Sequence, residues 1–205
     1  MKGPETHWSA LLKEARWYRI FSLCFQPPRP SLRNELRDLF SETGSGKERL
    51  WTLIEQSGFE AEHHYVLGSG GPCSPCESAY LGRALGGTER IMADVAGFYR
   101  AFAFHAHPEI TEPVDHIAVE LSFLSFLALK EAYALYRADA RSRTVCREAR
   151  ERFNHDHLLA WIPLFAEALR KGASGSFYEQ AARLMVERLL ARSTGEGAPG
   201  FHAVL

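Results

Sequence analysis

The segment from Ile117 to Tyr136 constrains the fold more strongly than any other. Its apolar residues recur at intervals of three and four positions: Ile117, Leu121, Leu124, Ala128, Ala132 and Leu135. This spacing places them on one face of an α-helix, and further apolar residues cover much of the remaining circumference. Its longest nearly uncharged apolar run, from Ile117 to Leu129, has 13 residues, whereas a membrane span needs about 20. The segment is therefore predicted to be a helix at the centre of a protein core.

Similar spacing predicts helices along most of the remaining chain, at residues 6–25, 32–40, 47–57, 88–108, 141–154, 157–169 and 177–191. The Gly-rich stretch 59–75 is expected to be a long loop. No run with the two-residue period of a β-strand exceeds four residues, and no internal repeat is visible. We therefore predict an all-α, single-domain, bundle-like fold of about seven to nine helices over residues 1–192, followed by a flexible tail at 193–205.

Positive and negative charges nearly cancel in this chain. Its 205 residues include 24 Lys or Arg and 25 Asp or Glu, which gives a formal net charge of −1. A nucleic-acid-binding protein needs a clear cationic excess to contact phosphates, so this class is not favoured. The N-terminal residues lack the apolar core and cleavage site of a secretory signal, and only four cysteines are present. A cytoplasmic location with reduced thiols and no membrane insertion is expected.

Cys73 and Cys76 form a C-x-x-C pair, which can chelate a metal or act as a dithiol. A structural zinc site needs four ligands, and no second C-x-x-C or C-x-x-H pair supplies the other two. A lone pair in a loop of glycines and prolines therefore favours two ordinary thiols. A small helical metal- or redox-responsive protein that uses these cysteines and neighbouring histidines is the alternative function.

Histidines occur in three closely spaced pairs, His63-His64, His105-x-His107 and His155-x-His157. Metal ligands on a helix favour a spacing of three or four residues, whereas residues two apart point about 200° away from each other. We therefore expect partly exposed loop histidines, with no metal and no cofactor. Sequence templates of hydrolases, zinc proteases and phosphate-binding loops are also missing. The chain is accordingly not expected to be an enzyme.

A polar motif, Glu112-Pro113-Val114-Asp115-His116, directly precedes the apolar segment. Pro113 suits the first turn of a helix, where Asp115 would complement the helix dipole. His116 and Glu120 are four residues apart and share a helix face, so the carboxylate can orient the imidazole or raise its pKa. The motif indicates either a capped helix start or a functional polar site. A catalytic role for the His–Glu pair is a further alternative.

This motif resembles the E-P-x-D-H signature of the TorD/DmsD/NarJ family of molybdoenzyme-specific maturation chaperones. Three other segments are similar to family motifs in the same order: residues 75–80 (PCESAY) to P-x-E-S-x-Y, residues 98–102 (FYRAF) to F-Y-x-A-F, and residues 153–163 (FNHDHLLAWIP) to F-x-x-x-H-L-x-x-W-x-P. The resemblance extends from about Leu11 to Leu190. The C-x-x-C cysteines are not part of this family pattern.

The resemblance implies a cytoplasmic chaperone without enzymatic activity. Such a chaperone binds the apo catalytic subunit of a molybdopterin-dependent oxidoreductase, often at its N-terminal signal or leader peptide. It prevents premature export or membrane attachment until the cofactor is inserted. Clients that are exported carry twin-arginine signals. The resemblance also implies a monomer or a helix-swapped dimer, because some family members exchange helices between protomers.

Charge is unevenly distributed around the polar motif. The 29 residues between Arg100 and Lys130 contain no Lys or Arg, but they include Glu109, Glu112, Asp115 and Glu120. Carboxylates beside exposed aromatic surface suit a peptide that is cationic at one end and apolar along the rest.

The candidate client-peptide-binding residues are Glu112, Pro113, Asp115, His116, Glu120, Tyr80, Phe98, Tyr99 and Phe102. Aromatic residues on helices more often belong to the core, which is the alternative for Phe98, Tyr99 and Phe102. Asp115→Ala combined with His116→Ala is expected to weaken client-peptide binding and to leave helicity and melting nearly unchanged.

Overall fold

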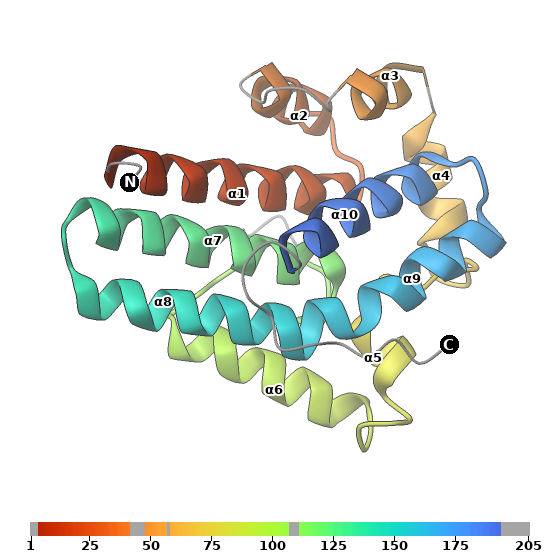
Figure 1. Ribbon diagram of the computed structural model, residues 1–205. Coiled ribbons are helices and arrows are strands. Elements are labelled where there is room, and N and C mark those ends of the chain that lie inside the picture. Colours follow the sequence, from red (N-terminus) through yellow and green to blue (C-terminus); the bar gives the residue numbers. More distant parts are fainter. Residues whose placement is uncertain (1–3, 42–47, 57, 107–110, 194–205) are drawn as a thin grey trace.

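The computed structural model describes residues 4–41, 48–56, 58–106 and 111–193, and these residues form an all-α fold (Figure 1). The helices are α1 (Pro4–Cys24), α2 (Leu32–Ser41), α3 (Glu48–Gln56), α4 (Phe59–Val66), α5 (Glu77–Leu81), α6 (Thr88–Ala101), α7 (Ile117–Tyr136), α8 (Ala140–Phe153), α9 (Leu159–Gly172) and α10 (Phe177–Ser193). A π-helical turn, Asn154–Leu158, joins α8 to α9 without a break. The described part thus contains nine separate helical rods, which confirms the predicted fold class.

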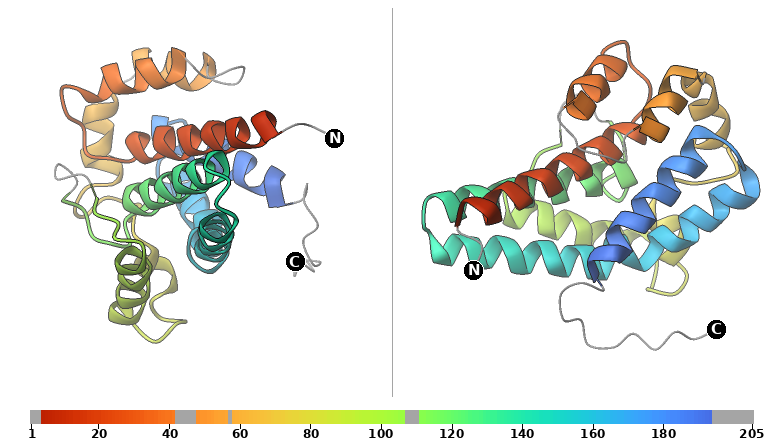
Figure 2. Two further views of the ribbon diagram at one scale, coloured as in Figure 1. Left: turned by 90° about the vertical axis from the view of Figure 1, so that its left-hand side faces the viewer. Right: turned by 45° about the horizontal axis from the view of Figure 1, so that its top comes forward.

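Helix α7 is the central helix, as its sequence predicts. It lies between α1 and α8, which run along opposite sides of it (Figures 1 and 2). Two serines allow α1 and α7 to approach closely, because each donates a hydrogen bond to a backbone carbonyl of the other helix. The Ser22 hydroxyl lies 2.8 Å from the carbonyl oxygen of Ala118, and the Ser125 hydroxyl lies 2.9 Å from that of Ala15. All four residues are buried.

An aromatic cluster fills the space between α6, α7 and α8. Phe123 of α7 is fully buried, and its ring centroid lies 4.8 Å from both Tyr99 and Phe153 and 5.2 Å from Phe104. Burial of each aromatic side chain in the cluster contributes about 1.5–3 kcal/mol to the free energy of folding. The cluster therefore fixes α6 against the central helices and holds the segment that precedes α7 in place.

The stretch predicted as a long loop, residues 59–75, begins with helix α4, so that prediction is wrong over residues 59–66. Phe59, His63 and Val66 are buried and follow the i, i+4, i+7 spacing of one helix face. The sequence pattern was missed because a histidine occupies the middle position of this face. The Tyr178 hydroxyl donates a 3.1 Å hydrogen bond to the carbonyl of Phe59, which ties α4 to α10.

Helix α6 ends at Ala101, well before Pro108, which lies outside the described residues. Ala103 has a φ of 51°, and the Phe104 N–H donates to the carbonyl of Tyr99 over 2.9 Å. This geometry is a Schellman motif, and the ring contact of Phe104 with Tyr99 at 5.1 Å is its usual apolar partner. The turn is set by local backbone geometry, so the proline is not needed to end the helix.

The predicted helices 141–154 and 157–169 form one continuous rod through the π-helical turn rather than two separate helices. The predicted tail at 193–205 begins at the last residue of α10, and its other residues lie outside the described part, so the boundary stays a prediction. Among the described helices, none is both long enough and apolar enough to cross a membrane.

Candidate functional site

The polar motif before α7 lies directly beside the start of α5. The Ile117 N–H donates to the carbonyl of Pro75 over 2.9 Å, and the Glu77 N–H donates to the carbonyl of Asp115 over 3.0 Å. These two bonds form a short antiparallel bridge between Cys76 and His116. Two segments that resemble family motifs are therefore held together by their backbones.

Asp115 caps α5 rather than α7. Its carboxylate accepts a 3.0 Å hydrogen bond from the Ser78 N–H in the first turn of α5, and its side chain is only 1% exposed. A carboxylate at this place satisfies an unpaired helix donor and complements the helix dipole. The predicted role at the end of α7 is wrong, because Asp115 lies two residues before α7 and points to the neighbouring helix.

His116 is the N-cap of α7. Its Nδ1 accepts a 3.1 Å hydrogen bond from the Ala118 N–H, and burial lowers the pKa of the imidazole to about 3, with a smaller contribution from His63. The neutral ring therefore carries its proton on Nε2, which lies 3.7 Å from a carboxylate oxygen of Glu112. Pro113 precedes the helix, and its carbonyl accepts a 3.0 Å hydrogen bond from the His116 N–H, which closes a turn. The prediction that Pro113 occupies the first helical turn is wrong.

Glu120 does not pair with His116, contrary to the prediction. It is fully buried and accepts a 3.0 Å hydrogen bond from the indole N–H of Trp161 on α9. Burial raises the pKa of Glu120 well above its usual value, and the charge of Glu77 raises it further. The raised pKa favours the protonated form of Glu120, which links α7 to α9 through its hydrogen bond with Trp161.

Glu120→Gln tests this protonation state. The folded protein keeps a proton on Glu120 that the unfolded chain loses above a pH of about 4.5, so Glu120 lowers stability increasingly as pH rises. Glutamine mimics the protonated acid and removes this penalty. Compared with the unmodified chain, the variant is expected to gain stability by up to about 1.4 kcal/mol per pH unit between pH 5 and 8. Urea unfolding at both pH values measures the difference, and a pH-independent difference would contradict the assignment.

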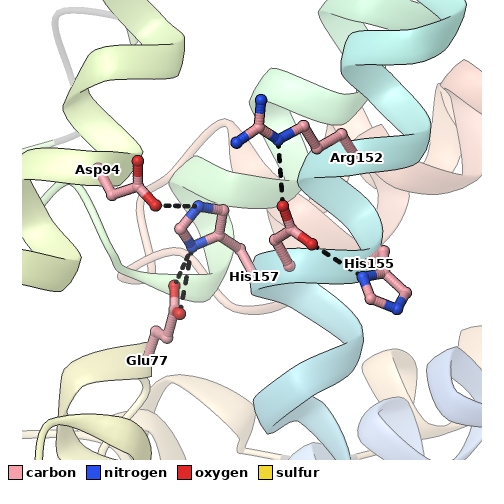
Figure 3. A network of polar contacts seen from close by, with 6 residues as sticks. Glu77, Asp94, Arg152, His155 and His157 are labelled. Carbon is pink, nitrogen blue, oxygen red and sulfur yellow. Dashed lines mark hydrogen bonds and ion pairs between the residues drawn. The ribbon is translucent and has the colours of Figure 1, made fainter. Parts of the chain in front are cut away.

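Glu77 and His157 form a second buried pair, which the sequence analysis did not single out (Figure 3). The Nδ1 atom of His157 lies 3.0 and 3.2 Å from the two carboxylate oxygens of Glu77, and both side chains are almost fully buried. On the other side of the ring, Nε2 faces the exposed carboxylate of Asp94 at 3.6 Å. His157 thus connects the core to an acidic group at the surface of α6.

The π-helical turn explains how His157 reaches this position. A π-helical turn inserts one residue into an α-helix and locally rotates the side chains that follow. His155 stays exposed beside Asp156, at 2.8 Å, while His157 turns inward against Phe98 and Phe153. The expectation that these histidines are exposed loop residues is wrong for His157. Turns of this kind are frequent at functional sites.

A cavity of about 470 Å³ opens beside this pair. Its polar lining consists of Glu77, Arg90, Asp94, Asp156 and His157, with apolar residues of the α5–α6 connection completing it. Asp156 is engaged by Arg152 at 3.2 Å (Figure 3). The three carboxylates therefore stand against two arginines, Arg90 and Arg152, which leaves the cavity with a small acidic excess.

The aromatic candidates surround these polar groups. Tyr80 stacks on Trp161 with 5.5 Å between ring centroids, and its hydroxyl donates to the carbonyl of Ser74. Phe98 packs edge-on against His157 at 5.6 Å, and the Tyr99 hydroxyl donates to the carbonyl of Val114 over 2.9 Å. Phe102 contacts Phe123 at 6.1 Å. All four segments that resemble family motifs therefore meet at one place.

The predicted site residues differ in exposure. Asp115, His116, Glu120 and Tyr99 are buried, whereas Glu112, Pro113, Tyr80, Phe98 and Phe102 are partly or fully exposed. Glu109 lies outside the described residues. Asp115→Ala with His116→Ala removes two buried helix caps, so we expect this double variant to lower stability, in contrast to the nearly unchanged melting expected from the sequence. These buried groups hold the loop that presents Glu112.

The cysteines offer little nucleophilic character. All four are free thiols, Cys73 is buried, and Cys76 is half-buried. Burial raises the pKa of Cys73, and burial together with Asp115 raises that of Cys76 to about 12. Within residues 4–41, 48–56, 58–106 and 111–193, no three His, Cys, Asp or Glu side chains are grouped to hold a metal ion. His63 is buried with a pKa lowered to about 4, mainly by burial, and His64 is exposed.

Several characterised proteins resemble this chain. It is 30% identical over 112 residues to the chaperone protein TorD of Photobacterium profundum, covering 55% of this chain and 50% of that protein. It is 35% identical over 112 residues to the chlorate reductase assembly chaperone protein of Ideonella dechloratans, covering 54% and 56%. The selenate reductase assembly chaperone protein of Thauera selenatis is 33% identical over 115 residues, covering 55% and 58%. The chain thus matches about half the length of these relatives.

The family described as nitrate reductase delta subunit matches residues 52–167, which is more than half of the chain. The chain belongs to the TorD/NarJ family of molybdoenzyme maturation chaperones. The names of its relatives describe chaperones rather than catalysts, in agreement with the expectation that it is not an enzyme. A crystal structure described as a redox enzyme maturation protein from Archaeoglobus fulgidus has the same fold, with a TM-score of 0.58 and 21% identity over 86% of this chain and 93% of that chain.

Proposed function

We propose that this member of the TorD/NarJ family binds, in the cytoplasm, the apo catalytic subunit of a molybdopterin-dependent oxidoreductase. It recognises the N-terminal signal or leader peptide and assists cofactor insertion and assembly before export or membrane attachment. The observation that carries the proposal is the convergence of four segments around the Glu77–His157 pair and the loop that presents Glu112.

The chemistry of this site supports a cationic peptide with an apolar stretch. Glu112 and Asp94 are accessible carboxylates, and the nearby cavity is acidic. Tyr80 and Phe98 provide partly exposed aromatic surface close to these charges. Arginine side chains pair strongly with carboxylates, while the apolar part of a peptide packs on aromatic rings. The buried groups behind them keep the surface preorganised, which lowers the entropic cost of binding.

Co-purification from the native cells tests the partner. The tagged full-length chain is isolated under mild conditions, and its dominant partner is identified by mass spectrometry. The proposal expects the catalytic subunit of a molybdenum oxidoreductase, retained when its N-terminal peptide is present and reduced when that peptide is deleted. Recovery of the same subunit with equal yield without its N-terminal peptide would contradict the proposed recognition mode.

Glu112→Gln tests the contribution of the accessible carboxylate. The side chain is partly exposed, and its carboxylate lies 3.7 Å from the neutral ring of His116. Its replacement therefore breaks no buried ion pair and leaves the core intact. Charge-assisted hydrogen bonds contribute about 1.5–3 kcal/mol, so we expect roughly a tenfold to hundredfold loss of affinity for the partner's N-terminal peptide in calorimetry. Glu148→Gln on the exposed face of α8 is the matched control. Equal affinity of both variants would exclude Glu112 from the binding surface.

A further inference from the structure

The loop end of the α7–α8 hairpin carries an apolar stripe on the surface. Leu129, Tyr133 and Tyr136 are 47%, 65% and 73% exposed, and their spacing of four and three residues places them on one face of α7. Val145 of α8 is 49% exposed. Half of the eight large apolar side chains that are exposed in the described residues thus lie on this hairpin.

Leu129 and Tyr133 of this stripe line a groove of about 660 Å³ between the two helices. Its apolar lining includes Phe126, Leu129 and Tyr133 of α7 and Cys146 of α8. The hairpin end projects beyond α6 and α9 (Figures 1 and 2), so neither of these helices covers this end. A groove between two antiparallel helices that pack side by side has the shape that accepts a third helix.

The surroundings of the groove are cationic. Lys130, Arg137, Arg141 and Arg143 lie on the hairpin end, against the acidic residues Asp139 and Glu131. Glu131 is buried and bound by Arg150 at 2.9 Å, so it does not offset these charges at the surface. Lys130 and Arg137 line the groove itself against one carboxylate, Asp139, and the Lys130 ammonium lies 4.9 Å from the ring centroid of Phe126.

We propose that this groove binds an acidic amphipathic helix of a partner protein. Apolar side chains at i, i+3 or i+4 and i+7 would fill the groove, and flanking carboxylates would pair with Lys130 and Arg137. A second copy of this chain does not fit, because a two-fold interface would oppose the same cationic rims. A lipid surface is flat and would leave the groove unfilled. The groove therefore selects the opposite charge from the acidic site near Glu112.

A synthetic 18-residue helical peptide tests the proposal. Leucines occupy its apolar stripe and glutamates its flanks, and a control peptide has lysine in place of each glutamate. Fluorescence anisotropy with the full-length chain is expected to show binding of the acidic peptide at least tenfold tighter than of the control. Leu129→Ala with Tyr133→Ala is expected to weaken binding at least tenfold, whereas Tyr65→Ala, at a residue 74% exposed on α4, should leave it unchanged.

Charge reversal provides an independent measurement. Arg137→Glu with Arg141→Glu is expected to abolish the preference for the acidic peptide, and circular dichroism checks that the fold is retained. Equal binding of both peptides by the unmodified chain would overturn the proposal. Binding to vesicles of phosphatidylserine and phosphatidylcholine that depends on Leu129 and Tyr133 would overturn it in favour of a membrane. A dimer in sedimentation that the same double variant dissociates would overturn it in favour of a second copy.

Discussion

Arg150→Ala is expected to lower the free energy of unfolding by about 3–5 kcal/mol, because it leaves buried carboxylates without their cation. Arg150 lies 2.8 Å from Glu14 of α1 and 2.9 Å from Glu131 of α7, and the two glutamates are only 5% and 4% exposed. A single guanidinium on α8 thus binds two carboxylates, one on α1 and one on α7. In a chain of this length the loss corresponds to a fall in Tm of about 10 °C. Chemical and thermal unfolding measure both quantities.

Two further variants separate the bridge from general charge effects. Arg150→Lys keeps the positive charge but lacks the planar fork of five donors that reaches both carboxylates, so an intermediate loss is expected. Arg152→Ala removes an exposed arginine that pairs with Asp156 at 3.2 Å and should change stability by less than about 1 kcal/mol. An equal effect of Arg150→Ala and Arg152→Ala would show that the buried bridge does not stabilise the α1–α7–α8 arrangement.

Trp161→Ala is expected to cost about 3–5 kcal/mol as well. The indole is fully buried, stacks on Tyr80, packs against Phe165 at 5.5 Å and donates the hydrogen bond to Glu120. Its removal leaves a cavity between α5, α7 and α9 and an unpaired buried acid. Because Tyr80 loses its stacking partner, affinity for the client peptide should also fall. Unfolding curves and calorimetry with the peptide check the two effects on one preparation.

Trp161→Phe distinguishes packing from hydrogen bonding. It keeps an aromatic ring but removes the N–H donor, so a loss of about 1–3 kcal/mol is expected from Glu120 alone. Leu164→Ala on the same helix, at a side chain 48% exposed, should have little effect. If Trp161→Phe matched the unmodified chain in stability, the hydrogen bond to Glu120 would not contribute.

Local patterns predicted the central helix well, because five of the six apolar residues at the predicted spacing are buried: Ile117, Leu121, Leu124, Ala128 and Ala132. Helix α4 was missed because His63 holds a buried position that an apolar residue usually takes. The continuity of α8 and α9 was missed for another reason. A π-helical turn breaks the 3.6-residue period, and the pattern then looks like a boundary between two helices.

The polar pairs of the site could not be read from spacing. Glu77 and His157 are 80 residues apart, and Glu120 and Trp161 are 41 apart, so only the tertiary fold brings them together. The segments that resemble family motifs contain Glu77, His157 and Trp161 but not Glu120, and they do not indicate which residues contact one another. His116 and Glu120 have helical i, i+4 spacing and still do not pair, because His116 caps the helix and Glu120 points to α9.

The molybdenum content of the client enzyme tests the central claim most directly. The oxidoreductase that co-purifies with this chain is isolated from cells with the chaperone, from cells without it, and from cells carrying Glu112→Gln. Elemental analysis per catalytic subunit is expected to show at least a severalfold loss of molybdenum without the chaperone and an intermediate value with the variant. A fully loaded enzyme in cells that lack the chaperone would contradict a role in its maturation.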